Sequence, residues 1–306
     1  MTDSLGSDVD ELLYNDFNFS RALRISCLND SGVVVCGEGS LPKSHGGSRM
    51  EITAFQKPQT STFPFVLDKL SLNKDGRVGC NVSISISDET KLFISGEDER
   101  QDPGKPLNSF GKIGATYDSG GIKIDNNVDI VNGPTACSSF YYAPTSSPWN
   151  FAADFQVNTR WDEKGANNST DGGITGRHTG LEWENINFGF QFNGPSWCVA
   201  AKTKERLSIL SLGYFQSLSP TFSYGTMVNY SINHNTQDLA LGIRKKMDQN
   251  TSVKFKITSA ADISGVLKHS LTPQLMLGIC SEMNLNQNIA ANQKFGICLT
   301  FDNDFN

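Results

Sequence analysis

The sequence predicts an all-β protein in which each strand has one apolar face and one polar face. Two observations predict this class: apolar and polar residues alternate one by one after residue 20, and turn-forming residues recur at short intervals. The alternation is clearest over residues 82–87, 186–192, 222–232 and 294–301. Because successive strand side chains point to opposite faces, such a chain is either a large soluble β protein or a transmembrane antiparallel β-barrel.

Turn signals divide the chain into short strands. Clusters such as Asn29–Gly32, Asn73–Gly76, Asp118–Gly121 and Asn193–Pro195 separate the alternating stretches. A spacing of roughly ten to fifteen residues suits an antiparallel meander of about 19 or 20 strands, each about nine residues long. No change of composition marks a second domain. We therefore expect one barrel over residues 19–306 and a separate N-terminal segment over residues 1–18.

The N-terminal segment has the pattern of a short amphipathic helix. Ser7 is a candidate N-cap, and acidic residues follow it in the first turn, where the helix dipole favours negative charge. Asn15 and Asp16 are expected to end the helix. The apolar stripe of this helix comprises Leu5, Val9, Leu12 and Leu13. The helix is too short and too acidic to span a membrane, so we expect the stripe to pack against another part of the protein.

Composition excludes several classes of protein. The formal net charge is −6, with 26 basic and 32 acidic residues, which argues against a nucleic-acid partner. The chain contains no run of about 18 apolar residues, so the sequence predicts no transmembrane helix. The first residues have neither the basic and apolar regions of a secretory signal nor the arginines of a transit peptide. We therefore expect synthesis in the cytosol and targeting by internal signals.

No group of residues predicts catalysis, a metal site or a cofactor. The seven cysteines are scattered and form no Cys-x-x-Cys pair, which argues against a zinc site and a disulfide framework. The four histidines are isolated from one another and from cysteine. The glycines at 111–114 and 172–173 do not lead into a helix with a following lysine, as a phosphate-binding loop requires. We therefore predict that the chain is not an enzyme.

Residue types on the polar faces favour the membrane barrel. Many of these positions hold Ser, Asn, Gly, Gln or Thr rather than Lys or Glu, which suits a water-filled interior. Aromatic residues such as Trp149 and Trp197 stand near the ends of strands, as in the interfacial girdles of membrane barrels. A soluble β-rich binding protein is the alternative, and a chain of this many strands would then be expected to form two domains with a linker.

The two ends of the chain resemble a known family. The segment DELLYNDFNF, residues 10–19, is similar to the opening of the voltage-dependent anion channel, the mitochondrial porin of the eukaryotic porin superfamily. Residues 251–285 and the closing stretch NQKFGICLTF are similar to the last strands of that family. Residues 85–215 share with the family only the spacing of strands and turns. The resemblance implies 19 strands, with the first and last strands parallel, and a helix inside the pore.

The last strand also resembles a membrane-insertion signal. Lys294, Gly296, Leu299 and Phe301 match the pattern of a polar residue, a glycine and two hydrophobic residues found in mitochondrial outer-membrane barrels. The chain departs from the family at one point. The animal members have a glycine-rich hinge between helix and first strand, where this sequence has Asn15-Asp16-Phe17-Asn18.

Strand phase assigns charged residues to the lumen if the apolar partners face lipid. The basic residues assigned to the pore lining are Arg24, Lys112, Lys123, Lys202, Arg244, Lys254, Lys256, Lys268 and Lys294. The acids assigned to the same face are Asp125, Asp129, Asp154, Asp262 and Glu282. A ring of Lys and Arg favours anions in transit.

The resemblance and the pore lining together predict a voltage-dependent anion-selective channel of the mitochondrial outer membrane. It would pass ATP, ADP, phosphate and small metabolites by diffusion, with membrane lipid around it and no cofactor. The expected partners are other copies of this chain, in a homo-oligomer, or other mitochondrial membrane proteins. The alternatives are the protein-import pore of the same membrane and a non-conducting, porin-like structural subunit of a membrane complex.

Overall fold

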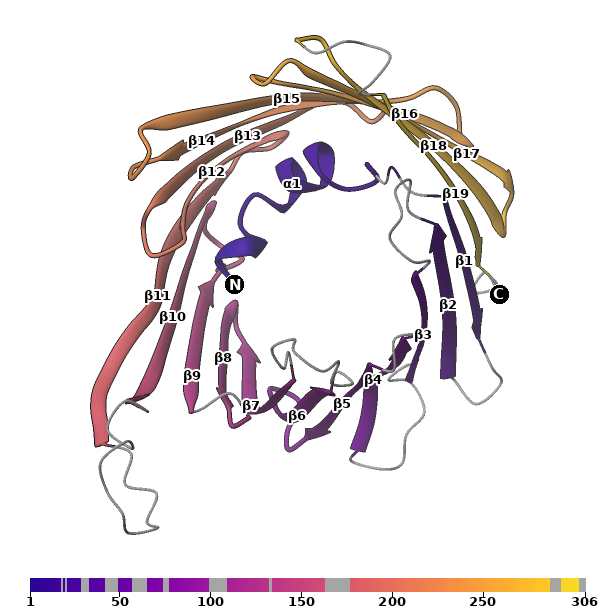
Figure 1. Cartoon of the computed structure of the whole chain (residues 1–306). Helices are drawn as coiled ribbons and strands as arrows, with labels where there is room; N and C mark the ends of the chain where they lie inside the picture. The colour runs from indigo at the N-terminus through magenta and orange to yellow at the C-terminus, as the bar shows by residue number, and fades with distance from the viewer. Residues whose placement is uncertain are drawn as a thin grey trace.

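The computed structural model describes residues 1–17, 19, 21–28, 33–41, 49–56, 65–73, 77–98, 109–131, 134–162, 177–286 and 293–302. One mixed sheet of 19 strands closes on itself as a barrel (Figure 1). Consecutive strands pair antiparallel, and the ring closes where β1 and β19 run parallel, with Leu23 opposite Leu299. The structure confirms the predicted barrel with an odd number of strands and a helix inside it.

The strands begin and end as follows. The first nine are β1 Arg21–Leu28, β2 Val33–Leu41, β3 Arg49–Gln56, β4 Phe65–Asn73, β5 Val78–Ser85, β6 Thr90–Asp98, β7 Phe110–Ser119, β8 Ile122–Asp129 and β9 Thr135–Tyr142. The others are β10 Trp149–Asp162, β11 Arg177–Asn193, β12 Trp197–Lys204, β13 Ile209–Ser219, β14 Phe222–Ser231, β15 Thr236–Lys246, β16 Thr251–Thr258, β17 Asp262–Thr272, β18 Leu275–Asn284 and β19 Lys294–Asp302.

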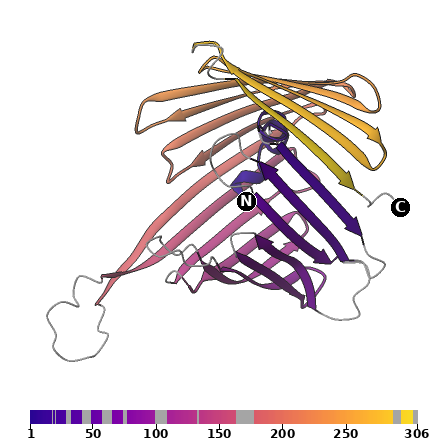
Figure 2. The same ribbon diagram turned by 45° about the vertical axis from the view of Figure 1, so that its right-hand side comes forward.

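Two strands are longer than the sequence predicts. β10 has 14 residues and β11 has 17, against the expected length of about nine. Figure 2 shows these two strands, in pink, extending together to the lower left, past the ends of their neighbours. Their pairing contains irregularities between Gln156 and Val157 and between Thr159 and Trp161. Bulges of this kind bend a strand and shift its register, which a simple count of alternating residues does not reveal.

The outer surface of the barrel is apolar. Large hydrophobic side chains such as Ile94, Phe151, Leu241 and Phe255 are exposed, while the residues between them along each strand face the interior. A soluble monomer rarely exposes an apolar surface that runs around the molecule, whereas a membrane barrel requires one. The outward band therefore favours the membrane barrel over the soluble alternative.

In the described parts of the chain, no helix is long and apolar enough to cross a membrane.

The N-terminal segment, residues 1–17, runs along the inside of the barrel (Figure 1). It contains a short 3-10 helix, η1 Thr2–Ser4, and one α-helix, α1 Ser7–Leu13. The N-cap is Gly6 rather than the predicted Ser7, and Gly6 has a left-handed backbone with φ of 72°. The segment turns sharply at this point, and a glycine adopts that conformation at little cost. η1 was not predicted.

Candidate functional site: the lumen and its N-terminal segment

The apolar stripe of the N-terminal segment packs on the barrel wall. Leu5, Val9, Leu12 and Leu13 are fully buried, with no exposed surface. Val9 and Leu13 form a cluster with Met227 and Ala240, which belong to β14 and β15. A seven-residue helix is too short to persist alone in water, so its contacts with the wall hold it in place.

A row of inward-facing glycines receives the four apolar side chains, one for each. A Cβ atom on Gly189 would lie 2.6 Å from Leu5, one on Gly213 would lie 3.3 Å from Val9, one on Gly225 would lie 3.0 Å from Leu12, and one on Gly242 would lie 2.6 Å from Leu13. These glycines lie on β11, β13, β14 and β15. The wall therefore has a groove lined by glycines, in which a side chain at Gly189 or Gly242 would force Leu5 or Leu13 to move.

Charged contacts attach the polar side of the N-terminal segment to the same wall. Lys202 on β12 is only 3% exposed in its side chain, and its Nζ atom lies 2.8 Å from the Asp10 carboxylate. The same ammonium donates a hydrogen bond to the Leu5 carbonyl oxygen. A lysine so deeply buried requires a charged partner, because taking an unpaired ammonium out of water is costly.

Two further acids of the segment bind basic residues of the wall. The Glu11 carboxylate accepts a hydrogen bond from Arg244 Nη1 at 2.9 Å. The Asp16 carboxylate lies between two ammonium groups, 2.7 Å from Lys254 Nζ and 2.5 Å from Lys268 Nζ. Four of the nine basic residues predicted to line the pore are thus paired with acids of the N-terminal segment: Lys202, Arg244, Lys254 and Lys268.

Asp16 lies in the linker where the animal family has its glycine-rich hinge. Its backbone is left-handed, with φ of 77°. Burial raises the pKa of its carboxyl, but hydrogen bonds and charge from Lys254 and Lys268 outweigh burial, and the pKa is lowered below the ordinary value of 3.8. The linker is therefore anchored to the wall at Asp16. Asn18, the last residue of the predicted linker, lies outside the described residues.

This lowered pKa predicts how docking of the segment depends on pH. The contribution of Asp16 is fully present above its undocked pKa of 3.8 and is lost as pH falls through the lower docked value. We expect the Val9 amide signal, followed by NMR in detergent micelles, to keep its docked position from pH 7 to pH 5. It should move only below pH 3.8. Release of the segment between pH 7 and 5 would contradict the Asp16 anchor, and the Asp16→Asn variant should dock more weakly already at pH 7.

Two more of the predicted basic residues contact aromatic rings of residues 14–19, in and just after the N-terminal segment. Lys256 Nζ lies 5.6 Å from the ring centre of Tyr14 and 4.5 Å from that of Phe17. Lys294 Nζ lies 5.8 Å from the ring centre of Phe19 and 2.6 Å from the Glu282 carboxylate. Both lysines therefore lie on the lumen side of the barrel wall.

The remaining three basic residues lie away from the helix. Lys112 and Lys123 belong to β7 and β8, whose apolar partners Ile113 and Val128 are exposed on the outside, so the two lysines face inward. Lys123 Nζ is 3.9 Å from an Asp118 carboxylate oxygen. Arg24 lies on β1 and lines a hollow in the lumen wall.

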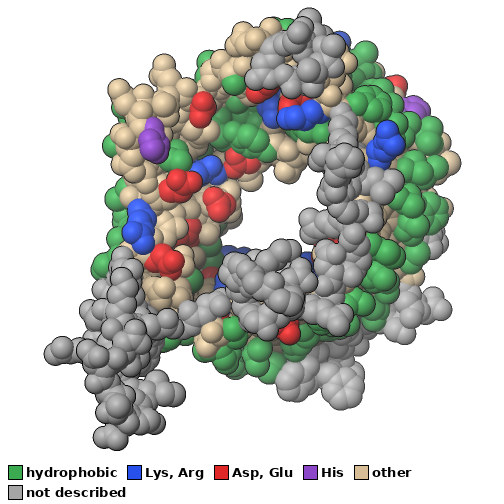
Figure 3. All heavy atoms as spheres, in the orientation of Figure 1, with side chains coloured by type: hydrophobic (Ala, Val, Ile, Leu, Met, Phe, Trp, Pro, Cys, Tyr) green, Lys and Arg blue, Asp and Glu red, His purple; other side chains and the backbone are tan. Residues whose placement is uncertain are grey.

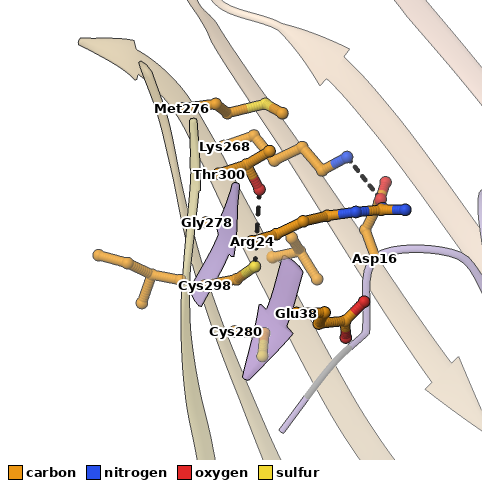
Figure 4. Close-up of a pocket in the computed structure, with 11 residues that line it drawn as sticks. Asp16, Arg24, Glu38, Lys268, Met276, Gly278, Cys280, Cys298 and Thr300 are labelled. Atoms are coloured by element: carbon orange, nitrogen blue, oxygen red, sulfur yellow. Dashed lines mark hydrogen bonds and ion pairs between the residues drawn. The ribbon is translucent and has the colours of Figure 1, made fainter. Parts of the chain in front are cut away.

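That hollow occupies the wall where the first and last strands meet. It has a volume of about 320 Å³, and its charged residues are Asp16, Arg24, Glu38 and Lys268. Figure 4 shows the Arg24 guanidinium beside the ion pair of Lys268 and Asp16, above the small residues Gly278 and Cys298. Among the described residues, no carboxylate lies within ion-pairing distance of Arg24 or Lys256.

Some functional positions were missed from the sequence. The helix groove depends on glycines at polar-face positions of β11, β13, β14 and β15, and this shared phase was the available signal. Lys91 also faces inward, because its neighbours Leu92 and Ile94 are exposed on the outside. Glu38 and Glu51 face the lumen as well and line a second hollow with Arg24. These acids make the lumen less basic than the predicted residues alone imply.

The proposed insertion signal lies on the closing strand, β19. Lys294 and Gly296 face the lumen, opposite Glu282 and Cys280 of β18. Leu299 and Phe301 lie on the other face, paired with Leu23 and Ile25 of β1, which are exposed on the outside. The two hydrophobic residues of the pattern thus face the membrane side of the seam.

The geometry defines a class: a closed β-barrel with an apolar exterior, a charged lumen and a helix docked within it, which is the construction of a membrane channel. Comparison with known proteins places it more closely. The family model for eukaryotic porin matches residues 175–296. Mitochondrial outer membrane protein porin 1 of Arabidopsis thaliana is 20% identical over 304 residues, which cover 96% of this chain and 95% of that protein.

Two other relatives match over shorter stretches. The mitochondrial outer membrane protein porin of 34 kDa from Solanum tuberosum is 24% identical over 39% of this chain, and the match spans 43% of that protein. A probable voltage-dependent anion-selective channel of Caenorhabditis elegans is 28% identical over 29% of this chain and 30% of its own length. The chain belongs to the eukaryotic porin family. It is a channel of the mitochondrial outer membrane and not an enzyme.

Proposed function

We propose that this porin lets small hydrophilic metabolites diffuse across the membrane, with a preference for anions such as phosphate, ADP and ATP. The observation that supports this most directly is the open lumen with basic side chains on its wall. Figure 3 shows an opening through the centre of the barrel, with Lys, Arg, Asp and Glu side chains around it. Cations fixed along a low-dielectric channel raise the local concentration of anions.

The basic residues are concentrated on one arc of the wall, from β15 through β19 to β1. Six of the nine predicted residues lie on these strands: Arg24, Arg244, Lys254, Lys256, Lys268 and Lys294. The acids of the same strands that share the inward phase are Asp238, Asp262, Glu282 and Asp302. Glu11 and Asp16 of the N-terminal segment add two negative charges to this arc. The docked segment therefore reduces the positive potential that the wall alone would have.

The same segment is the candidate for a voltage response. It carries five acids and no Lys or Arg within residues 1–17. A membrane potential acts on charge in the lumen with about 2.3 kcal/mol per charge for a full crossing of 100 mV. Movement of an acidic body away from its basic wall would change both the width and the charge of the pore.

Permeation through purified protein tests the proposal. The protein is reconstituted into vesicles loaded with ATP and with a large fluorescent dextran, and release of each is followed over time. We expect ATP to leave within seconds while the dextran stays inside. Vesicles that contain folded, inserted protein but retain their ATP would contradict the proposal and favour a non-conducting structural subunit.

A further inference from the structure

The outer surface of the barrel contains a pair of polar side chains at mid-strand. Asn126 is the fifth of eight residues in β8, and Ser138 is the fourth of eight in β9. The two residues are register partners, and the Ser138 hydroxyl donates a hydrogen bond of 2.7 Å to Asn126 Oδ1. We refer to Asn126 and Ser138 as the outer polar pair.

Apolar side chains surround the outer polar pair. Along β8 and β9 the neighbours on the same face are Ile124, Val128, Ala136 and Phe140. The pair lies in a hollow of about 540 Å³ on the outside of the barrel. Its apolar walls comprise Ile113, Val128, Ala136, Phe155, Val157 and Trp183.

The hydrogen bond within the pair satisfies only part of the Asn126 side chain. Within the described part of the chain, no hydrogen bond is formed by Asn126 Nδ2, and Asn126 is exposed. A carboxamide has two N–H donors as well as its carbonyl oxygen. Hydrocarbon chains accept no hydrogen bond, so these donors are unsatisfied when lipid covers the hollow. The polar groups of lipids lie at the membrane surface, away from the middle of the strands.

We propose that the face formed by β8, β9, β10 and β11 is the contact surface for a second copy of this chain, with Asn126 in its hollow. A carboxamide carries a donor and an acceptor side by side, so two copies related by a twofold axis can exchange two hydrogen bonds between their Asn126 side chains. The same chemistry fixes pairing when a single Asn stands in an otherwise apolar helix interface. In a membrane, such a polar contact favours association over separate barrels in lipid.

The rest of this face has the residue types of a protein contact surface. Beside the hollow, β10 and β11 present aromatic rings that pack on one another, and large aromatic residues are enriched at the centres of interfaces. The rings in contact are Trp149, Phe151, Phe155, Phe188, Phe190 and Phe192. The aromatic surface is continuous with the hollow and supplies apolar area that a second copy can bury. The hydrogen bonds of Asn126 fix how the two copies are aligned.

Association of the purified full-length chain in lipid vesicles tests this proposal. The protein carries a dye on a C-terminal tag, and single-molecule photobleaching counts copies at increasing ratios of protein to lipid. We expect wild type to be dimeric at dilute ratios. Asn126→Leu should require a ratio roughly tenfold higher to reach the same dimer fraction. Asn127→Leu is the matched control, because Asn127 is the next residue of β8 and faces the lumen, and it should associate like wild type.

A second measurement locates the contact and does not depend on how well Asn126→Leu folds. Cys27 and Cys80, the exposed cysteines, are replaced by serine, and one cysteine is introduced at a time on the outer surface. A short bis-maleimide should join two chains through Asn126→Cys and not through Ile257→Cys on β16. Three results would overturn the proposal: monomers at every ratio, dimers of Asn126→Leu equal to wild type, or cross-linking at position 257 instead of 126.

Discussion

Valine in place of Gly242 should release the N-terminal helix from the barrel wall. A Cβ at this position would lie 2.6 Å from Leu13 Cδ2, so Leu13 must move. The same Cβ would lie 3.4 Å from Leu12 Cγ, and the two methyl groups that valine adds beyond Cβ would crowd Leu12 as well. Burial of each leucine contributes about 1.5–3 kcal/mol. The freed segment cannot keep its seven-residue helix without these contacts.

Hydrogen exchange of the helix amides measures this release. The amides of Val9, Asp10 and Tyr14 donate hydrogen bonds within the N-terminal segment and should exchange slowly in wild type. In Gly242→Val we expect exchange to accelerate by about a hundredfold or more, the factor that corresponds to about 3 kcal/mol. Gly37→Val is the control, because a Cβ there would meet no atom within 4 Å. Equal exchange in wild type and Gly242→Val would show that the groove does not hold the helix.

Removal of residues 1–17 should make the channel both wider and more selective for anions. The deletion takes away five acids and no Lys or Arg. It leaves Lys202, Arg244, Lys254 and Lys268 without their partners on the segment. We expect the anion-to-cation permeability ratio to rise roughly two- to threefold, which corresponds to a change of about half a kT per unit charge in the lumen potential, because the anion gains what the cation loses.

A full-length variant separates charge from width in this prediction. Asp10→Asn, Glu11→Gln and Asp16→Asn together remove the paired acids and leave the four apolar side chains of the stripe unchanged. Slow exchange of the Val9 amide selects the conditions in which this variant keeps its helix docked. Its selectivity should shift toward anions as in the deletion, while its conductance should stay nearer to that of wild type. If the deletion left selectivity unchanged or moved it toward cations, the acids of the N-terminal segment would not reduce the positive potential of the lumen wall.

The barrel and the internal helix could be predicted because their signals are local. Alternation in stretches such as residues 186–192 fixes which side chains share a face, and the stripe from Leu5 to Leu13 has helical spacing. The chain ends resemble the eukaryotic porin family, and the family comparison confirms that assignment. In the structure Lys254 and Lys256 both contact residues of the N-terminal segment inside the barrel.

The pairing of charges could not be predicted, because it depends on where the N-terminal segment lies along the wall. Asp16 meets Lys254 and Lys268 across more than 230 residues of sequence, and no local pattern links them. The glycine groove is similar: each glycine is unremarkable in its own strand, and its role follows only from the alignment of β11 to β15. Bulges in β10 and β11 likewise changed strand lengths that periodicity alone had set.

The most direct test of the account is the reversal potential of purified protein in a planar lipid bilayer under a salt gradient. We predict stepwise conductance and a reversal potential that favours anions in the open state, because the arc from β15 to β1 presents basic side chains to the lumen. A preference for cations, or no conductance from protein shown to be folded and inserted, would contradict an anion-favouring metabolite channel.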